Sequence, residues 1–210
     1  MSVEAFKNFI DGQWVAGESV IANINPSDTR DTIGQYARAT AADGLAAIEA
    51  ANRAFDGWAQ SGLEQRKAIL DFIGNELIAR KDEIGAVLAR EEGKTLAEGV
   101  GEVGRSGQFF QYYAAETLRL MGENTASVRP GVDVDVQREP LGVVAIITPW
   151  NFPLAVAAWK VAPALCYGNC VVLKPAELVP ASAWMLAEII SRSGLPAGVF
   201  NLVMGAGRDV

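Results

Sequence analysis

The segment that most constrains the fold is residues 141–177, LGVVAIITPWNFPLAVAAWKVAPALCYGNCVVLKPAE, in which apolar runs alternate with short polar turns. Val143 to Ile147 is an unbroken apolar run rich in β-branched residues, which is typical of a parallel strand covered on both faces. The TPWN turn, residues 148–151, ends that run, and Pro153 suits the first position of a helix because its missing N–H needs no partner there. The segment therefore begins as a strand, a sharp turn and a helix.

The second half of the segment predicts a helix end, another strand and another turn. Gly168 and Asn169 favour the end of the helix, and Cys170 to Leu173 forms a second apolar strand. The KPAE turn, residues 174–177, closes this strand. Successive parallel strands joined by a right-handed crossover end at the same edge of a sheet. The TPWN and KPAE turns should therefore face one crevice, where ligands bind in α/β sheets.

The residues that follow repeat this alternation. A helix is predicted over 181–192, and residues 195–198 turn the chain into a third apolar strand, Val199 to Val203. A glycine-rich turn, residues 205–207, comes next. This order predicts an α/β fold with a Rossmann-like parallel sheet and flanking helices. It leaves the third strand with an unpaired edge, which is an unusual place for a natural chain to stop.

Shorter antiparallel pieces are predicted on either side of a helical region. Asp11-Gly12 is a hairpin dipeptide between two short apolar runs, and residues 19–24 and 32–38 are expected to be extended. Residues 127–138 alternate valines with polar residues after a Pro130-Gly131 turn, which predicts a two-stranded ribbon with one apolar face. A lone ribbon is marginally stable in water, so this protruding β-hairpin is expected to bind another surface.

Helices are predicted to begin at two capping boxes. Thr40 with Asp43, and Ser61 with Glu64, have the spacing of this device. The first of these helices is predicted to bury one stripe at helical spacing, made of Leu45, Ile48, Ala51, Phe55 and Trp58.

A glycine pattern at residues 99–104, GVGEVG, matches the G-x-G-x-x-G pattern of dinucleotide-binding loops. That pattern marks such a loop only where it joins a strand to a helix. Here a helical pattern runs through it, and we interpret the glycines as close-packing points on a long helix. The apolar residues that carry the pattern are Leu96, Val100, Val103 and Phe110.

Composition and charge disfavour several classes of partner. With 50% hydrophobic and 20% charged residues, the 210-residue chain is expected to be globular. Its net charge of −7 repels phosphate groups, so no nucleic-acid or membrane binding is expected, and partners should be small molecules or further copies of the chain.

The first residues, MSVEAFKNFIDG, lack the basic and apolar regions of a secretory signal, which predicts a cytoplasmic protein. Residues 152–173 are apolar but interrupted by Lys160 and Pro163, so no membrane span is predicted.

Histidine and cysteine usage narrows the chemistry further. The chain contains no histidine, which removes Ser-His-Asp and Cys-His catalysis and most zinc sites. Cys166 and Cys170, the only thiols, lie in an apolar run, where a free cysteine behaves as a small hydrophobic residue. We expect both to be structural, and no metal site is predicted.

Three motifs stand at the turns of the predicted sheet: ITPWNFP at 147–153, APALCYGNCVVLKPAE at 162–177 and GLPAGVFNLVMGAG at 194–207. Together, and in their spacing, they resemble the aldehyde dehydrogenase superfamily. The similarity covers the whole chain. Within the superfamily, KNFIDGQWV at 7–15 and REEGKTLAEGVGEVGRSGQFF at 90–110 are most similar to α-ketoglutaric semialdehyde (2,5-dioxovalerate) dehydrogenases. The resemblance implies the N-terminal part of an aldehyde dehydrogenase fold.

The resemblance implies an NAD(P)-dependent oxidation of an aldehyde to a carboxylic acid, with α-ketoglutaric semialdehyde as the expected substrate. In that family a cysteine thiolate attacks the aldehyde, hydride passes to nicotinamide, and a glutamate activates the water that hydrolyses the thioester. The oxyanion is held by the cysteine's backbone N–H and by an asparagine amide, with which Asn151 aligns. By its position alone, Asn151 suits either this catalytic role or a cap of the helix that follows.

The resemblance also implies the cofactor-binding residues. Lys174 and Glu177 would bind the adenosine ribose of NAD or NADP, although by charge alone they also suit a solvated ion pair. Glu177 would repel a 2′-phosphate and Lys174 would attract one, so the choice between NAD and NADP stays open. Gly207 aligns with the second glycine of a G-x-G-x-x-x-G turn, where a missing Cβ lets the backbone approach the cofactor. The remaining implied contacts are Ile147, Thr148, Pro149 and Trp150.

The family's nucleophilic cysteine and general-base glutamate have no counterpart in this sequence, because Cys166 and Cys170 align with structural positions. The chain is therefore expected to be part of a longer enzyme, inactive by itself, that acts on a small-molecule aldehyde as a homodimer or homotetramer. Residues 1–122 would begin the NAD(P)-binding domain, 123–140 would form a hairpin of the oligomerisation domain, and 141–210 would form the truncated βαβαβ half of the NAD(P)-binding domain.

Two other functions stay open at this point. A non-catalytic nucleotide-binding or assembly module would need neither the cysteine nor the glutamate. An acyl-CoA-producing member of the same superfamily would share the motifs described above. A reading frame that continues past Val210 into a cysteine-bearing segment would favour the enzyme over the module.

Overall fold

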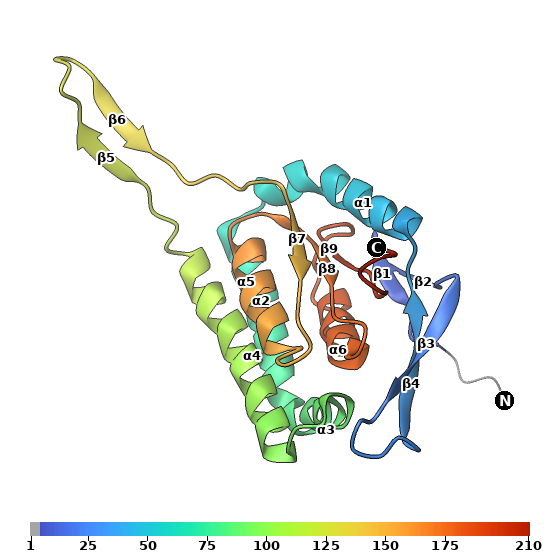
Figure 1. Cartoon of the computed structure of the whole chain (residues 1–210). Helices are drawn as coiled ribbons and strands as arrows, with labels where there is room; N and C mark the ends of the chain where they lie inside the picture. Colours follow the sequence, from blue (N-terminus) through green and yellow to red (C-terminus); the bar gives the residue numbers. More distant parts are fainter. Residues whose placement is uncertain (1–4) are drawn as a thin grey trace.

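A five-stranded sheet forms the centre of the computed structural model, which describes residues 5–210 (Figure 1). Residues 1–4, on which the expected absence of a secretory signal partly rests, lie outside that range. The strand order is β2-β1-β9-β8-β7, with β7, β8 and β9 parallel to one another, which confirms the predicted α/β fold. The strands are β1 (Asn8–Ile10), β2 (Gln13–Val15), β7 (Val143–Ile147), β8 (Cys170–Lys174) and β9 (Phe200–Leu202).

Helices cover both faces of this sheet. The crossover helices α5 (Ala155–Cys166) and α6 (Pro180–Ser191) lie on one face of the sheet. Both belong there because β7, β8 and β9 follow one another across the sheet and each crossover is right-handed. Helix α1 (Ala41–Ala59) covers the other face. Every residue of β8 is buried between these layers. No helix within residues 5–210 combines the length and apolarity needed to cross a membrane. An outer layer packs on α5 and α6 and consists of α2 (Leu63–Ala79), α3 (Lys81–Glu92) and α4 (Leu96–Thr117).

The edges of the sheet differ from the sequence prediction. Phe9 of β1 pairs with Leu202 of β9, so the N-terminal hairpin covers the edge that was expected to be open. The edge strand of the parallel part is β7 instead, and its Ala145 and Ile147 side chains are exposed. The prediction that this strand is covered on both faces was therefore wrong, because α1 packs mainly over β8.

The start of α5 also differs from the prediction. The helix begins at Ala155, so the assignment of Pro153 to its first position was wrong. The end was predicted correctly, since Cys166 is the last helical residue and Gly168 adopts a left-handed φ of +84°. Pro180, in contrast, does occupy the first turn of α6.

Carboxylates from the outer layer cap both crossover helices, which have no caps from their own side chains. Glu102 of α4 accepts hydrogen bonds from the backbone N–H groups of Leu154 and Ala155, both at 3.0 Å. Glu91 of α3 accepts from two backbone N–H groups at the start of α6, both at 2.8 Å. Because unpaired N–H groups at a helix start favour a negative charge, these two carboxylates set where the helices begin and join the two helical layers.

The first two helices confirm one predicted capping box and correct the other. Thr40 and Asp43 form the box at the start of α1. Ser61 does not cap α2, since its hydroxyl donates to the carbonyl oxygen of Trp58 at 2.6 Å and Gly62 is the N-cap.

The buried face of α1 is rotated from the predicted one. Leu45 and Ile48 are exposed, so the predicted stripe was wrong at these two positions. The helix approaches the turn before β9 closely, because a Cβ added to Gly198 would lie 2.6 Å from the carbonyl oxygen of Ala50. Small side chains therefore occupy most of this face, whose buried residues are Ala47, Ala50, Ala51 and Trp58.

The GVGEVG pattern lies inside the continuous helix α4, so it is not a dinucleotide-binding loop. Gly99 is a close-packing point as predicted, since an added Cβ would lie 2.5 Å from the carbonyl oxygen of Gly85. An added Cβ at Gly101 or Gly104 would meet no atom within 4 Å. The close-packing interpretation was therefore wrong for these two glycines, which line the open side of the helix.

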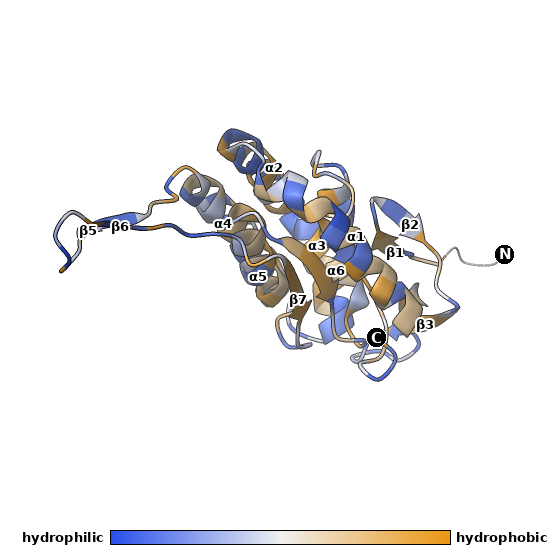
Figure 2. Ribbon diagram, turned by 90° about the horizontal axis from the view of Figure 1, so that it is seen from above, coloured by the Kyte–Doolittle hydropathy of each residue, from blue (hydrophilic) through white to orange (hydrophobic). Residues whose placement is uncertain are grey.

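The remaining strands form two antiparallel ribbons, and the extended conformation predicted for residues 19–24 and 32–38 is confirmed. β3 (Ser19–Ile24) pairs with β4 (Thr32–Arg38), and β5 (Glu123–Ala126) pairs with β6 (Asp133–Val136). The β5–β6 ribbon extends away from the helices and the central sheet in Figure 1 and Figure 2, and all its strand residues are exposed. Its first strand lies wholly before residues 127–138, so the prediction of both strands within that segment was wrong, and only β6 and the turn at Pro130-Gly131 fall inside it.

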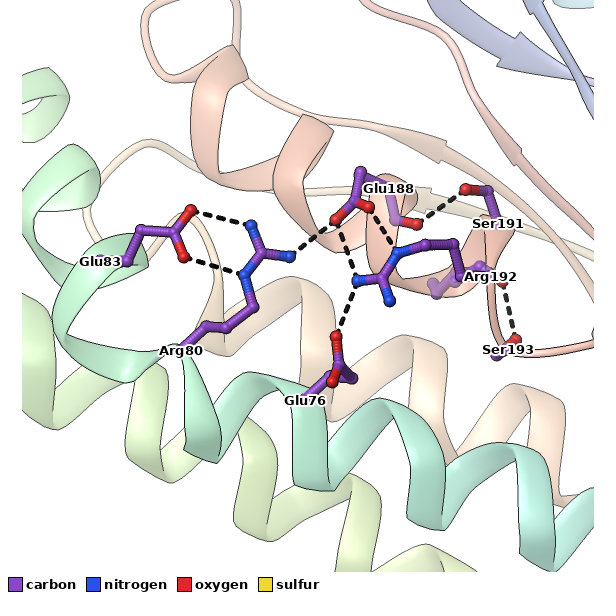
Figure 3. A network of polar contacts seen from close by, with 8 residues as sticks. Glu76, Arg80, Glu83, Glu188, Ser191, Arg192 and Ser193 are labelled. Carbon is purple, nitrogen blue, oxygen red and sulfur yellow. Dashed lines mark hydrogen bonds and ion pairs between the residues drawn. The ribbon is translucent and has the colours of Figure 1, made fainter.

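An ion-pair network on the surface fastens α6 to α2 and α3 (Figure 3). One arginine at the junction of α2 and α3 donates to two carboxylates, and a second, at the end of α6, does the same. We call this group the helix network; it consists of Glu76, Arg80, Glu83, Glu188 and Arg192.

Candidate active site

The TPWN and KPAE turns lie side by side at the carboxyl edge of the parallel strands. Ile147, the last residue of β7, is the register partner of Lys174, the last residue of β8. Immediately beyond, the backbone N–H of Thr148 donates to the carbonyl oxygen of Lys174 at 3.2 Å. The two turns therefore meet at one edge, as the crossover topology predicted.

Asn151 is exposed in the turn that precedes α5. It does not cap this helix, because Leu154 is the N-cap and the carboxylate of Glu102 binds the first N–H groups. The main-chain carbonyl oxygen of Asn151 accepts from Lys94 Nζ at 3.0 Å, whereas its side-chain amide has no hydrogen-bond partner within residues 5–210. The helix-cap interpretation is therefore excluded, and the amide is free to donate to a ligand.

Lys174 and Glu177 form a loose pair beside this turn. Their Nζ and Oε2 atoms are 3.8 Å apart, and Lys174 also donates to the carbonyl oxygen of Pro175 at 3.0 Å. The Lys174 side chain is 11% exposed and that of Glu177 is 45% exposed, so Lys174 is not a solvated surface charge. An ammonium group has three N–H donors. Lys174 therefore keeps donors for a ligand at the sheet edge.

A cavity of about 190 Å³ joins the KPAE turn to the glycine-rich turn after β9. A Cβ added to Gly207 would meet no atom within 4 Å, so Gly207 borders open space at this end of the sheet. The cavity lies between the two turns, with the β3–β4 ribbon at its side. It is lined by Ile21, Arg38, Pro175, Ala176, Glu177, Pro180, Met204, Gly205, Ala206 and Arg208.

Thr148 gives an independent indication that this edge binds a ligand. The residue is 4% exposed, and its hydroxyl oxygen has no hydrogen-bond partner within residues 5–210. A buried hydroxyl without a partner is costly, and such groups are often completed by a bound molecule. Next to it, Ile147, Pro149 and Trp150 expose apolar surface at the same edge. Free donors beside exposed apolar side chains fit a nucleotide cofactor, which offers hydroxyl groups and flat rings.

Three charged residues near the site were not predicted from the sequence. Lys94 donates to the carbonyl oxygen of Asn151, Glu102 accepts from the N–H of Leu154 at the end of the same turn, and Arg208 lines the cavity. The sequence contains an indication for Glu102, because this acidic residue falls at helical spacing among the buried residues of α4. A buried acidic side chain needs a partner. Arg208 directly follows the glycine-rich turn, which is a weaker signal.

The two cysteines lie away from this edge, within the core. Both are buried, and burial raises the pKa of Cys170 to about 11 and the pKa of Cys166 above its usual range. Thr117 Oγ1 lies 3.3 Å from Cys166 Sγ. Neither thiol is a ready thiolate, which agrees with structural roles. Within the described residues, no three His, Cys, Asp or Glu side chains are grouped so as to hold a metal ion.

A parallel α/β sheet with polar turns at its carboxyl edge places the chain in the class of α/β proteins that bind ligands, often nucleotides, at that edge. The model of the aldehyde dehydrogenase family matches residues 14–210. The chain therefore belongs to the aldehyde dehydrogenase family, which confirms the resemblance seen in its motifs.

Curated relatives include the alpha-ketoglutarate semialdehyde dehydrogenase of Haloferax volcanii, which is 39% identical over 97% of this chain and 43% of its own length. The alpha-ketoglutaric semialdehyde dehydrogenase of Bacillus subtilis is 40% identical over 98% of this chain and 42% of its own length. The chain thus spans about two fifths of the length of these relatives.

Solved structures match the fold closely. An NADP-dependent enzyme of E. coli superposes with a TM-score of 0.94 at 36% identity, covering 98% of this chain and 43% of that chain. Betaine aldehyde dehydrogenase from Staphylococcus aureus, solved in complex with NAD+, has a TM-score of 0.93 at 33% identity, covering 100% of this chain and 42% of that chain. The N-terminal part of the aldehyde dehydrogenase fold is therefore confirmed.

Proposed function

We propose that the complete protein containing these residues oxidises an aldehyde to a carboxylic acid and transfers the hydride to NAD+ or NADP+. The observation that carries the proposal is the Asn151 amide, which has no hydrogen-bond partner within residues 5–210. It lies in the same turn as Thr148, whose buried hydroxyl also lacks a partner among these residues and whose N–H contacts Lys174. Membership of the aldehyde dehydrogenase family supports it.

Asn151 is proposed to donate a hydrogen bond to the aldehyde oxygen as a thiolate adds to the carbonyl carbon. Because the amide has no partner within residues 5–210, it can stabilise the oxyanion without first breaking another hydrogen bond. Cys166 and Cys170 are poor candidates for the attacking thiolate, since both are buried. The proposal therefore assigns the nucleophile and the water-activating base to residues outside these 210.

The cofactor is proposed to lie across the carboxyl edge of β7, β8 and β9. Lys174 and Glu177 would bind the adenosine ribose, and Gly207 would let the backbone approach the cofactor. Ile147, Thr148, Pro149 and Trp150 would line the same surface. The half-exposed Glu177 would accept from a ribose hydroxyl and disfavour the 2′-phosphate of NADP.

α-Ketoglutaric semialdehyde is the proposed substrate, because the relatives from Haloferax volcanii and Bacillus subtilis bear that name. Residues 123–140 are proposed to belong to an oligomerisation domain, separating residues 1–122 and 141–210 of the NAD(P)-binding domain. The exposed valines of the β5–β6 ribbon need a covering surface, and a second copy of the protein in a homodimer or homotetramer would supply it.

The test is formation of reduced nicotinamide by the complete enzyme supplied with α-ketoglutaric semialdehyde, succinic semialdehyde or betaine aldehyde. The account predicts aldehyde-dependent reduction of NAD+ or NADP+, with the highest kcat/KM for α-ketoglutaric semialdehyde. A higher kcat/KM for another aldehyde would reject the proposed substrate but keep the reaction. Cofactor binding without any aldehyde-dependent reduction would contradict the reaction and favour the non-catalytic nucleotide-binding module.

A further inference from the structure

Lys94 and Glu102 form a largely buried ion pair that contacts the main chain of the Asn151 turn and of α5. Lys94 Nζ lies 2.7 Å from Glu102 Oε2, and the two side chains are 11% and 2% exposed. Burial of two charges is costly unless their remaining donors and acceptors are also satisfied. Here they are satisfied by the main chain of the proposed active site.

Glu102 uses both of its carboxylate oxygens. Oε1 accepts from the backbone N–H groups of Leu154 and Ala155, and Oε2 accepts from Lys94. This places a negative charge at the positive end of α5, where no side chain of the helix itself does so. Glu102 therefore fixes the point at which the Asn151 turn passes into the helix.

Lys94 reaches the turn itself. Its Nζ donates to the main-chain carbonyl oxygen of Asn151 at 3.0 Å and lies 4.5 Å from the ring centroid of Phe152. The same atom is 3.4 Å from Glu92 Oε2. With three N–H donors, Lys94 donates to both Glu102 and the Asn151 carbonyl oxygen, while Glu92 lies near enough only for an ion pair.

The turn has few other anchors. It leaves the edge strand β7, and Trp150, Asn151 and Phe152 are all exposed. The N–H of Thr148 holds its start to β8, and the N–H of Val156 donates to the carbonyl oxygen of Phe152 at 3.1 Å at its end. Among residues 5–210, the hydrogen bond from Lys94 is therefore the one that holds the peptide of Asn151 itself.

We propose that Lys94 and Glu102 are positioning residues that hold the main chain of Asn151 so that its amide meets the oxyanion. This inference rests on the proposed role of Asn151. A misplacement of about 1 Å costs on the order of 10²-fold in rate. Loss of Lys94 should therefore lower kcat, while the cofactor contacts at the KPAE turn are unchanged.

The first test is Lys94→Met in the complete enzyme, since methionine keeps an unbranched apolar side chain but removes all three N–H donors. The expected kcat is about 10- to 100-fold lower, with the KM for the cofactor changed by no more than about twofold. Lys94→Arg, which keeps the charge and the donors, should recover part of the loss. Lys67→Met is the matched control, because it removes an ammonium group from an ion pair with Asp71 on α2 and should leave kcat unchanged.

A double-mutant cycle separates positioning from a general loss of structure. If Lys94 acts through Asn151, Lys94→Met should have little further effect on kcat in the Asn151→Ala background. Losses that multiply in the double variant would overturn the inference. Retention of kcat by Asn151→Ala alone would instead reject the proposed role of Asn151, so the two failures are distinguishable.

Hydrogen exchange gives a readout that needs no turnover. Glu102→Gln keeps the shape of the side chain and one acceptor oxygen but removes the charge. In Glu102→Gln and Lys94→Met, the amides of Leu154, Ala155 and Val156 should exchange about tenfold faster than in the wild-type enzyme, because charge-assisted hydrogen bonds that hold the start of α5 are lost. The start of α6, which is capped by Glu91, should be unchanged. Wild-type exchange rates at these three amides in both variants would overturn the inference.

Discussion

The helix network and the Lys94–Glu102 pair use the same chemistry in different surroundings. In the network, the side chains of Arg192 and Glu188 are 44% and 26% exposed, and the ion pairs join side chains of α2, α3 and α6 (Figure 3). Lys94 and Glu102 are 11% and 2% exposed, and they also bind main-chain groups of the Asn151 turn and of α5. One group braces helices, whereas the other holds the backbone of a proposed active site.

The two groups are expected to differ in the stability that is lost on substitution, because they differ in exposure to water. Exposed ion pairs are screened and typically contribute about 0–1 kcal/mol each. A buried pair contributes little by its presence, but removal of one partner leaves a charge without water or a counter-ion, at a cost of about 3–5 kcal/mol. The helix network should therefore tolerate substitution, and the buried pair should not.

The largest expected contrast is between Glu102→Ala and Glu188→Ala. Glu102→Ala leaves the largely buried Lys94 ammonium with Glu92 alone as a counter-ion and removes the cap of α5, so it should cost about 3–5 kcal/mol of stability. Glu188→Ala breaks two partly exposed ion pairs and should cost no more than about 2 kcal/mol. Urea unfolding of the complete enzyme measures both. Equal costs would show that burial does not distinguish the two groups.

A second prediction compares a buried and an exposed charge within the proposed cofactor site. There the Lys174 side chain is nearly buried and that of Glu177 is half exposed. Glu177→Gln should shift the preference toward NADP by about 1–3 kcal/mol, because repulsion of the 2′-phosphate is lost. Lys174→Ala should weaken both cofactors, and NADP more. The measurement is kcat/KM for each cofactor at fixed ionic strength. An unchanged ratio in Glu177→Gln would place this carboxylate away from the ribose.

A third prediction repeats the contrast within the GVGEVG pattern. Gly99→Ala brings a Cβ to 2.5 Å from the carbonyl oxygen of Gly85, so it should destabilise by about 1–3 kcal/mol. Gly101→Ala meets no atom within 4 Å and should stabilise by up to about 1 kcal/mol, since alanine favours a helix over glycine. The measurement is the change in the thermal midpoint of unfolding of each variant. Opposite signs are expected, and a shared sign would contradict the packing described for α4.

The smallest expected effect is the acid sensitivity of the helix network. Partial burial alone would raise the pKa of Glu188, but hydrogen bonds from Arg192 and Arg80 hold it below the usual value of 4.5. A carboxyl group with a lowered pKa contributes stability that is fully present above its unfolded-state value and is lost as pH falls through the folded value. Glu188→Gln should therefore make thermal stability less dependent on pH below about 4.5, by at most about 1 kcal/mol. An unchanged acid profile would show that the network contributes nothing measurable.

The order of the parallel strands was predictable from sequence because it depends on local spacing. The apolar runs predicted for β7 and β8 match the strands at all but one end residue, and Gly168 marks the end of α5 where expected. The capping box of Thr40 and Asp43 is local in the same way. Periodicity and turn residues were therefore sufficient to predict these strands and helix ends.

Contacts between distant segments were not predictable by the same means. Phe9 pairs with Leu202, so the edge expected to be open is covered by the opposite end of the chain. Glu102 caps a helix that begins more than 50 residues later, and no local pattern links it to Leu154. The free amide of Asn151 depends on that remote cap, because Glu102 binds the N–H groups that an asparagine cap would otherwise have taken.

The most direct test of the central claim is the turnover of Asn151→Ala in the complete enzyme, with the exposed Asn75→Ala on α2 as the control. Removal of one oxyanion donor typically lowers kcat by about 10²–10³-fold, or roughly 3–4 kcal/mol. We expect this loss in Asn151→Ala, with the KM for the cofactor and the thermal midpoint unchanged, because Glu102 rather than Asn151 caps α5. A variant that kept its kcat, or lost only stability, would contradict the account.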